Sequence, residues 1–361
     1  MIARGLKGIT CTETKMSFID GEQGRLIYRG YDAADLAQTH SFEEVAYLLW
    51  YGTLPNQEQL IELKKQFQAS RKLPDNMKSI IASVPHSHDM LSVLRTALSS
   101  VELTDENQAT ITDAISLTSL TPAIIAYRQS LQQDIAFPEE RSDLDHVAYY
   151  LYMITGKEPS KAYVQALETY MILTMEHGLN ASTFSARVTA STESDIASAI
   201  TSAVGTMKGP LHGGAPSGVI ELLNESVQQE DIREFIREKV QQGEKLMGFG
   251  HRVYKTWDPR AQAIKKILQQ QKQEDDWFDL ALNVEEASIN VLEELKPGRN
   301  LYTNVEFYAA AILRELTIPT NLFTATFTAS RMVGWTAHVM EQLEDNTIFR
   351  PSAEYVGPFY S

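Results

Sequence analysis

Apolar residues recur at helical spacing along most of the chain, and long alternating runs are missing. Three sets each fall on one helical face: Leu91, Leu94, Leu98 and Val101; Ile196, Ala199, Ile200, Ala203 and Val204; and Leu280, Val284, Ala287, Val291 and Leu295. Short alternating stretches occur only between Cys11 and Tyr28. The pattern predicts an all-α protein with a small β element near the N-terminus.

Start and stop signals agree with this helical interpretation. Ser41 and Glu44 have the spacing of a capping box, and Asp258 before Pro259 is typical of a helix start. Lys296-Pro297-Gly298 indicates a helix end. Glycines cluster at 205–218 and 243–250, where we expect loops between helices that act as hinges or approach a ligand closely.

Composition narrows the class of protein. The 361 residues predict one large domain or two unequal ones. Acidic residues outnumber basic ones by 47 to 32, so the field repels nucleic acid, and an anionic substrate would need arginines gathered in a cleft. Cys11 is the only cysteine, which excludes an intrachain disulfide. No apolar run suggests a membrane span, and no secretory signal is evident, so we expect a cytoplasmic protein.

Three familiar site patterns are not supported. His86 and His88 lack a third ligand at suitable spacing, so no metal site is expected there. The stretch 214–218 is not a GxSxG nucleophile elbow. GFGHRV at 248–253 lacks the last glycine and the βαβ setting of a dinucleotide site.

Histidines in glycine-rich loops are the better candidates for chemistry. His212 lies in GPLHGGAP and His251 in GFGHRVYKTWDPR, where small neighbours give the ring little cover. His177, in EHGLNAST, is open to either a structural or a functional interpretation. Two such histidines with a carboxylate provide a general base and two hydrogen-bond donors, which suits enolisation of a substrate.

Glu306, in NVEFYAAAIL, allows two interpretations. Asn304 is a good N-cap, and an acidic side chain in the first turn favours the helix dipole, so the residues alone leave Glu306 as a structural group or a base. Arg260, Arg331 and Arg350 individually resemble surface charges. Arg260 and Arg331 are expected in helix first turns, where a cation needs a compensating anion such as a ligand.

Eight stretches in order resemble the citrate synthase family, closely its short bacterial form, over essentially the whole chain. They are GLKGITCTETKMSFIDGEQGRLIYRGYD, SVLRTALS, EHGLNASTFSAR, MKGPLHGGAP, MGFGHRVYKTWDPRA, LYTNVEFY, SRMVGWTAHVMEQ and FRPSAEYVGP. The resemblance implies a helical homodimer with a large domain at 1–214 and 317–361 and an inserted small domain at 215–316. Oxaloacetate would bind first and close the two domains, which completes the acetyl-CoA site.

The resemblance also implies roles for single residues. His212 matches the donor to the thioester carbonyl of acetyl-CoA, and His251 matches the group that binds and protonates the ketone oxygen of oxaloacetate. The groups that hold the oxaloacetate carboxylates correspond to His177, Arg260, Arg331 and Arg350. Arg350 would reach in from the other subunit of the dimer.

The coenzyme A contacts follow in the same way. The loop that cradles adenine corresponds to Leu246, Met247, Gly248, Phe249 and Gly250, and basic side chains near the phosphates correspond to Lys255 and Arg299. The family resemblance implies neither a cofactor nor a metal, because the coenzyme A thioester is itself a substrate.

Glu306 departs from the family, which has aspartate as the base. Glutamate moves the carboxylate by roughly 1.5 Å, and a misplacement of about 1 Å can cost on the order of a hundredfold in rate. We therefore expect Glu306 to be the base of a citrate synthase with low activity. Two alternatives remain: a 2-methylcitrate synthase that uses propionyl-CoA, and a catalytically idle relative that binds coenzyme A or dicarboxylates for regulation.

Overall fold

The computed structural model describes residues 3–6, 8–105, 108–213, 215–251, 253–270 and 276–359, without the side chains at 215–217 and 276. Within these ranges the chain forms sixteen α-helices, two short 3-10 helices and one three-stranded sheet. The predicted all-α class is therefore confirmed. None of the described helices has the length and apolar character needed to cross a membrane.

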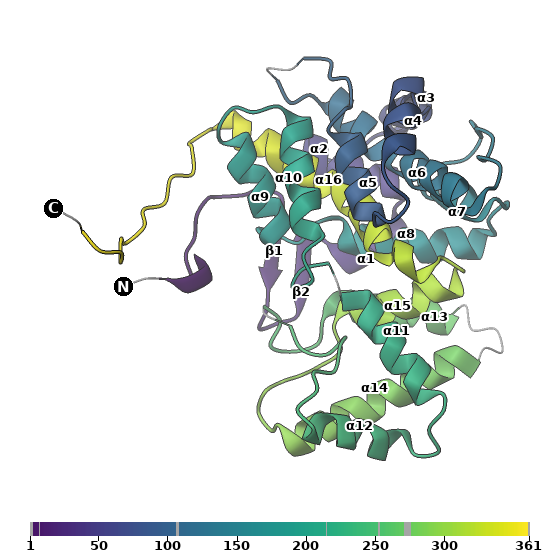
Figure 1. Cartoon of the computed structure of the whole chain (residues 1–361), viewed down its shortest axis with the longest axis vertical. Coiled ribbons are helices and arrows are strands. Elements are labelled where there is room, and N and C mark those ends of the chain that lie inside the picture. Colours follow the sequence, from purple (N-terminus) through teal and green to yellow (C-terminus); the bar gives the residue numbers. More distant parts are fainter. Residues whose placement is uncertain are drawn as a thin grey trace.

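The α-helices follow one another from Ala33 to Glu344 (Figure 1). The first eight are α1 (Ala33–Thr39), α2 (Phe42–Tyr51), α3 (Gln57–Ser70), α4 (Asp75–Ser83), α5 (Met90–Leu98), α6 (Ile111–Gln133), α7 (His146–Thr155) and α8 (Lys161–Met175). The others are α9 (Ala181–Ala190), α10 (Ile196–Met207), α11 (Ala215–Ser226), α12 (Ile232–Gln241), α13 (Pro259–Gln270), α14 (Asp276–Leu295), α15 (Val305–Glu315) and α16 (Phe323–Glu344). The 3-10 helices are η1 (Arg4–Leu6) and η2 (Thr320–Leu322).

A small antiparallel sheet lies where the β element was expected. Its strands are β1 (Ser17–Asp20), β2 (Arg25–Tyr28) and β3 (Tyr31–Asp32), in the order β1-β2-β3, with Ser17 opposite Tyr28. The buried Tyr28 hydroxyl donates to the carbonyl oxygen of Glu176 at 2.8 Å. The sheet is thereby attached to the chain directly after α8, close to the residues expected at the site.

Helix α16 lies at the centre of the upper part of the molecule, which contains α1 to α10 and α16. It packs against α6, α8, α9 and α10. Most of its side chains are buried, including Trp335, as is the greater part of α6. Trp50 of α2 donates its indole N–H to Thr336 of α16 at 3.0 Å. A helix surrounded in this way is buried on nearly all sides, which is typical of the interior of a large helical protein.

Several predicted helix boundaries are confirmed. Ser41 and Glu44 form a capping box at the start of α2. The Asp258 side chain accepts from the backbone amide of Arg260 in the first turn of α13, which begins at Pro259. α14 ends at Leu295, directly before Lys296-Pro297-Gly298. Local capping chemistry therefore set these boundaries.

Other local predictions were wrong. Val101 lies beyond α5, which ends at Leu98. Gly205 lies inside α10 and Gly218 inside α11, so both are helical and not in the connecting loop. Val204 and Val219 beside them are buried in the core, and one glycine costs too little to break a helix. The loop is therefore shorter than expected, and its described residues are 208–213.

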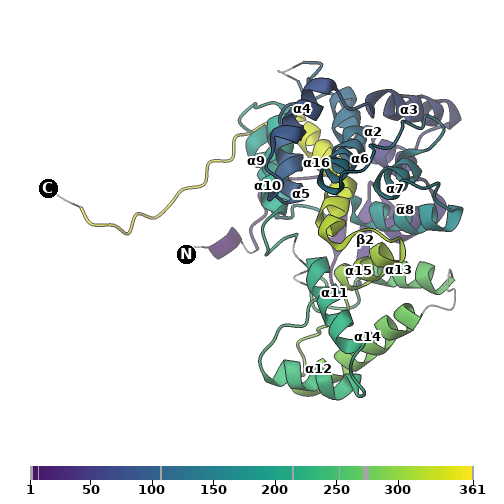
Figure 2. The same ribbon diagram turned by 45° about the vertical axis from the view of Figure 1, so that its right-hand side comes forward.

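The segment between α10 and α16 forms the lower part of the molecule, and α12 and α14 lie furthest from α6 (Figures 1 and 2). α12 packs against α14, and α11 packs against α15. α13 and α15 also contact α8, so these two helices join the lower part to the upper part. After α16, the C-terminal segment extends away from the rest of the molecule (Figure 1).

Candidate active site

Three aromatic rings meet between the upper and lower parts. His177 follows α8, while His251 and Tyr254 lie in the loop before α13. The Nε2 atom of His177 is 3.2 Å from the Tyr254 hydroxyl, and the two histidine rings are 5.4 Å apart between centroids. The structure thus brings together two histidines that are far apart in the sequence.

His251 is arranged as a hydrogen-bond donor. Its Nδ1 atom accepts from the backbone amides of Val253 and Tyr254 at 3.1 and 3.2 Å. Burial, and then the charge of Arg260, lower the pKa of His251 to about 4. The ring is therefore neutral at pH 7, and its single proton resides on Nε2 because Nδ1 is already an acceptor.

Arg260 is buried against His251 and Asp258, and is not the surface charge that its sequence context suggested. Two hydrogen bonds join its guanidinium to Asp258, at 3.0 and 2.8 Å, and its Nη2 lies 3.4 Å from Nε2 of His251. Burial opposes the ionisation of Asp258, but the charge of Arg260 lowers its pKa. The anion that we expected a ligand to provide is thus present in the chain itself.

Arg331 is also buried, and its predicted place in a helix first turn was wrong. It lies in the interior of α16, where Ser330 donates back to the carbonyl of Phe327 and is no N-cap. The Nε atom of Arg331 donates to the carbonyl of Thr174 at 2.6 Å. Burial lowers its pKa, while the nearby charge of Glu176 opposes that shift. A buried cation of this kind favours an anionic partner.

Glu306 lies in the first turn of α15, as predicted, and its side chain is partly buried. Burial raises its pKa to about 7; the charges of Arg260 and Arg331 oppose this shift, whereas Asp258 adds to it. In the described part of the chain no hydrogen bond reaches the carboxylate. A carboxyl group with a pKa near 7 is suited to act as a general base at neutral pH.

His212 lies in the turn between α10 and α11. Its Nε2 atom is hydrogen-bonded to the Ser182 hydroxyl at 2.7 Å, and Trp335 donates its indole N–H to the same oxygen at 3.0 Å. Burial, and then the charge of Arg331, lower the pKa of His212 to about 4. His212 is therefore neutral at pH 7 and, like Glu306, lies within the field of Arg331.

The loop expected to cradle adenine is fixed by backbone hydrogen bonds. Gly248 and Gly250 have φ of 87° and 82°, a region that favours glycine. The carbonyl of Gly248 accepts from Asn304, and the amide of Gly250 donates to Tyr302, at 2.9 and 2.7 Å. Phe249 forms a β-bridge with Thr303. Leu246, Gly248 and Phe249 are buried, while Met247 and Gly250 are partly exposed.

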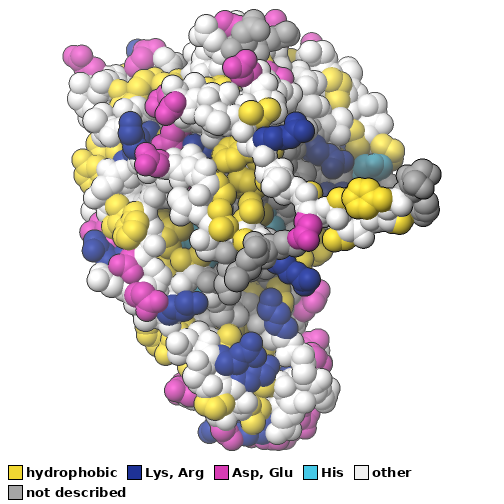
Figure 3. Space-filling view, turned by 90° about the vertical axis from the view of Figure 1, so that its left-hand side faces the viewer, with side chains coloured by type: hydrophobic (Ala, Val, Ile, Leu, Met, Phe, Trp, Pro, Cys, Tyr) yellow, Lys and Arg dark blue, Asp and Glu magenta, His cyan; other side chains and the backbone are white. Residues whose placement is uncertain are grey.

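Lys255 and Arg299, the basic residues expected near the phosphates, are both exposed. Lys255 lies in the loop before α13, and Arg299 lies in the loop after α14. Basic side chains are spread over the lower part of the face in Figure 3. Arg350 is exposed on the segment after α16, and within the described chain its side chain makes no hydrogen bond or ion pair. A single chain therefore does not bring Arg350 to the other arginines.

The comparisons with known proteins extend over nearly the whole chain. The family model described as "Citrate synthase, C-terminal domain" matches residues 5–352. The chain belongs to the citrate synthase family. It is accordingly an enzyme of the citrate synthase type, an acyltransferase that converts the acyl group into an alkyl group on transfer.

Similar proteins include members with two different names. "Citrate synthase 2" of Bacillus subtilis is 40% identical, over 98% of this chain and 96% of its own. The "2-methylcitrate synthase" of Shewanella oneidensis is 39% identical, over 98% and 94%. The citrate synthase of Thermoplasma acidophilum, solved as a ternary complex with carboxymethyl coenzyme A and oxaloacetate, has a TM-score of 0.89 and 31% identity, over 100% and 97%.

Sequence reasoning missed several residues of this candidate site. Asp258 was interpreted only as a cap, although an aspartate two residues before a buried arginine is a signal for an ion pair. Tyr254, Ser182 and Trp335 gave no local signal, because Tyr254 contacts His177, Ser182 contacts His212, and Trp335 contacts Ser182 only through the fold. Glu176 is fully buried beside His177 and accepts from His338 at 3.0 Å.

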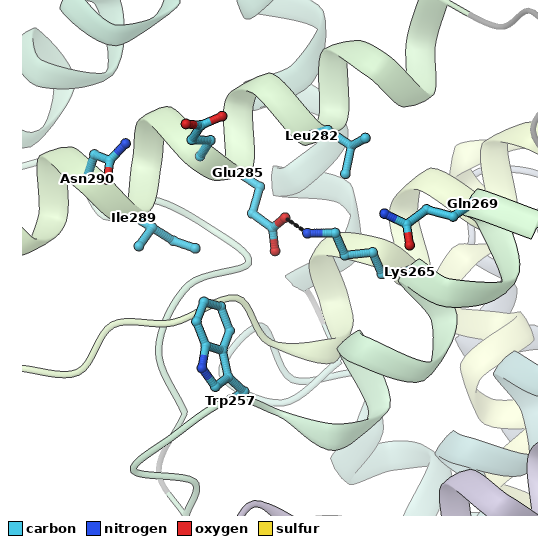
Figure 4. Close-up of a pocket in the computed structure, with 8 residues that line it drawn as sticks. Trp257, Lys265, Gln269, Leu282, Glu285, Ile289 and Asn290 are labelled. Atoms are coloured by element: carbon cyan, nitrogen blue, oxygen red, sulfur yellow. Dashed lines mark hydrogen bonds and ion pairs between the residues drawn. The ribbon is translucent and has the colours of Figure 1, made fainter.

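A separate cavity of about 410 Å³ lies between α13 and α14 (Figure 4). Lys265 donates to the buried Glu285 across it, and Trp257 forms part of its wall. None of the residues expected to act in citrate synthase chemistry lines it. His86 and His88 are exposed, and the described chain contains no group of three or more His, Cys, Asp or Glu placed to hold a metal.

Proposed function

We propose that this enzyme condenses acetyl-CoA with oxaloacetate and hydrolyses the citryl thioester to citrate and free coenzyme A. The observation that carries the proposal is Glu306, whose pKa is about 7 and which lies in the field of Arg260 and Arg331. One group can thus take a proton from carbon while two cations attract a dicarboxylate. The solved ternary complex of the Thermoplasma relative contains oxaloacetate and a coenzyme A derivative, which supports this pairing.

The reaction uses three residues in turn. Glu306 removes a methyl proton from acetyl-CoA, and neutral His212 donates a hydrogen bond to the thioester oxygen, which stabilises the enol. The enol carbon attacks the ketone carbon of oxaloacetate, and Nε2–H of His251 supplies the proton to the ketone oxygen. Water then cleaves the thioester and releases coenzyme A.

The substrates bind at the residues named from the family resemblance. His177, Arg260 and Arg331 hold oxaloacetate, with Arg350 contributed across a homodimer interface. Coenzyme A contacts the loop 246–250, with Lys255 and Arg299 near its phosphates. The proposed reaction needs no cofactor, and we assign the enzyme to the cytoplasm.

We further propose that residues 215–316 form a small domain that moves against 1–214 and 317–361. α13 and α15 carry Arg260 and Glu306, and both helices contact α8, which precedes His177. A movement of this part would bring the base and the arginine toward His177 and Arg331. Closure on oxaloacetate would exclude water before acetyl-CoA binds.

Glu306 makes this a slow enzyme, because the longer side chain places its oxygens differently from those of aspartate. The test is coenzyme A release from acetyl-CoA and oxaloacetate by wild type, Glu306→Asp and Glu306→Gln. We expect aspartate to accelerate release and glutamine to abolish it. If all three proteins bind oxaloacetate but release no coenzyme A, the synthase assignment fails and a regulatory role replaces it.

A second candidate is 2-methylcitrate synthesis from propionyl-CoA. It is favoured by the Shewanella relative, which is as similar to this chain as the Bacillus citrate synthase is. The two reactions differ by room for one methyl group, worth about 1–3 kcal/mol. The ratio of kcat/KM for the two thioesters separates them, and a tenfold preference for propionyl-CoA would reverse our order.

A further inference from the structure

The position of the Glu306 carboxylate depends on the backbone of the first turn of α15. In the described part of the chain, no hydrogen bond from another residue reaches its oxygens, while burial and the charges of Arg260, Asp258 and Arg331 shift its pKa. A glutamate has several rotatable bonds, so its reach is defined only if the first turn of α15 is held firmly. What holds that turn therefore determines where the base lies.

Two side chains bind the free amides of this turn. The amide of Val305 donates to Asp258 at 3.0 Å, and the amide of Glu306 donates to Oδ1 of Asn304 at 3.0 Å. Helix amides at these positions have no intrahelical partner, so such caps fix where the helix begins. Asn304 is the N-cap and lies directly in the segment that leads into α15.

Asn304 is also bound on its other side. Its side-chain amide donates through Nδ2 to the carbonyl of Gly250 at 2.9 Å, and its backbone amide donates to Gly248 at 2.9 Å. Gly250 directly precedes His251. One carboxamide therefore connects the amide of Glu306 to the carbonyl next to His251, with its acceptor on one side and its donor on the other.

We infer that Asn304 is a positioning residue that fixes Glu306 relative to His251 through this bridge. The inference rests on the proposed function, in which these two residues move protons on two substrates that must meet. If the side-chain bond to Gly250 is lost, α15 remains capped and the main-chain bonds to Gly248 and from Gly250 remain, but the carboxamide no longer connects the first turn of α15 to the carbonyl next to His251. The distance between the base and the proton donor is then set less closely.

The carboxamide makes the two bonds through different atoms, which gives a selective variant. Asn304→Asp keeps an oxygen to accept from Glu306, and aspartate caps helices as well as asparagine does. It loses the donor to Gly250 and places an anionic oxygen against that carbonyl. Asn304→Ala removes both bonds and tests the cap together with the bridge.

The matched control is Asn56→Asp. Asn56 is an exposed N-cap of α3 whose side chain accepts from the amide of Gln59, in a region distant from the site. The substitution is chemically the same as Asn304→Asp, but it breaks no contact to another helix or strand. We expect wild-type kcat and KM in this control.

The experiment measures kcat and KM for coenzyme A release between pH 6 and 9, oxaloacetate binding by calorimetry, and amide hydrogen exchange. We expect Asn304→Asp to lower the plateau kcat by about tenfold to a hundredfold, in line with a displacement of about 1 Å, and to change the Kd of oxaloacetate by less than about threefold. In this variant, amide hydrogen exchange should become faster at 246–251 and stay slow in the first turn of α15.

The pH profile separates position from charge. The added carboxylate raises the pKa of Glu306, so a pure charge effect disappears once the pH is high enough to ionise the base. A wild-type plateau in Asn304→Asp overturns the inference, as does unchanged exchange at 246–251. If wild type itself releases no coenzyme A, the proposed function fails, and the exchange data still decide whether Asn304 holds the two segments together.

Discussion

Asp258 accepts a hydrogen bond of 3.0 Å from the backbone amide of Val305, the residue directly before Glu306. The same carboxylate holds the guanidinium of Arg260 through two hydrogen bonds. One buried aspartate therefore connects the loop of His251 with the proposed substrate arginine and with the helix of the proposed base. Its removal should affect stability and catalysis together.

We expect Asp258→Asn to lower the free energy of unfolding by roughly 3 kcal/mol, because it leaves the buried charge of Arg260 without its anion. The acid limb of kcat should move to lower pH, because the Asp258 charge raises the pKa of Glu306. Urea unfolding at pH 8 and a pH–kcat profile measure both effects. Asp143→Asn, at an exposed pair with Arg141, is the control and should change neither much.

The rate should rise with pH through about 7, because Glu306 must lose its proton to act as a base and its pKa is about 7. His212 and His251, with pKa values of about 4, stay neutral across this range and should add no second limb between pH 6 and 8. A profile of kcat from pH 5 to 9 checks this. A rate that is flat through pH 7 would argue against Glu306 as the base.

Stability should fall over part of the same range. The folded pKa of Glu306, about 7, is above its ordinary value of 4.5, so protonation favours the folded state. This stabilisation is complete below pH 4.5 and is lost as the pH rises through 7. Glu306→Gln removes it, so the difference in unfolding free energy between variant and wild type should grow between pH 5 and 8. A constant difference across those urea titrations would contradict the buried carboxyl.

Gly21→Ala, in the turn between β1 and β2, should displace the loop that carries His251. A Cβ at Gly21 would lie 2.3 Å from the carbonyl oxygen of Val253, and Lys255 donates its backbone amide to Gly21 at 2.8 Å. The loop at Val253 must then move and displace His251, a proposed oxaloacetate ligand. We therefore expect KM for oxaloacetate to rise several-fold.

Gly205→Ala is the matched control for this substitution. It lies inside α10, and its added Cβ would meet nothing closer than Cδ of Arg95, at 3.8 Å. The same exchange there should raise the free energy of unfolding by about 0.5–1 kcal/mol without changing KM. An unchanged KM in Gly21→Ala would show that the loop can yield without moving His251.

Helices and caps were predictable because their signals are local. Ile196 to Val204 repeat at helical spacing, and Ser41 with Glu44 cap a helix through residues three apart. Arg331 shows the limit, since a serine before an arginine imitates a helix start although the helix begins earlier and continues through it. Only the packing of α16 against its neighbours decides that case.

The sequence named candidate residues for the site, whose roles stay predictions, but it gave none of the contacts between them. Glycine-rich surroundings selected His212 and His251, and family resemblance added the arginines. The ion pair of Arg260 with Asp258 was within local reach but was not recognised. The bond from Asp258 to Val305 and that from Trp335 to Ser182 join distant segments, and no spacing in the sequence encodes them.

The pairing of 248–250 with 302–304 is formed mainly by main-chain groups, and the Asn304 side chain adds one hydrogen bond to it. Substitutions at Phe249, Tyr302 or Thr303 leave those hydrogen bonds in place, so these positions can drift during evolution. Gly248, Gly250 and Asn304 cannot drift as freely, because two need an uncommon backbone angle and the third needs both ends of a carboxamide. We expect divergent homologues to vary between these three positions while retaining the three themselves.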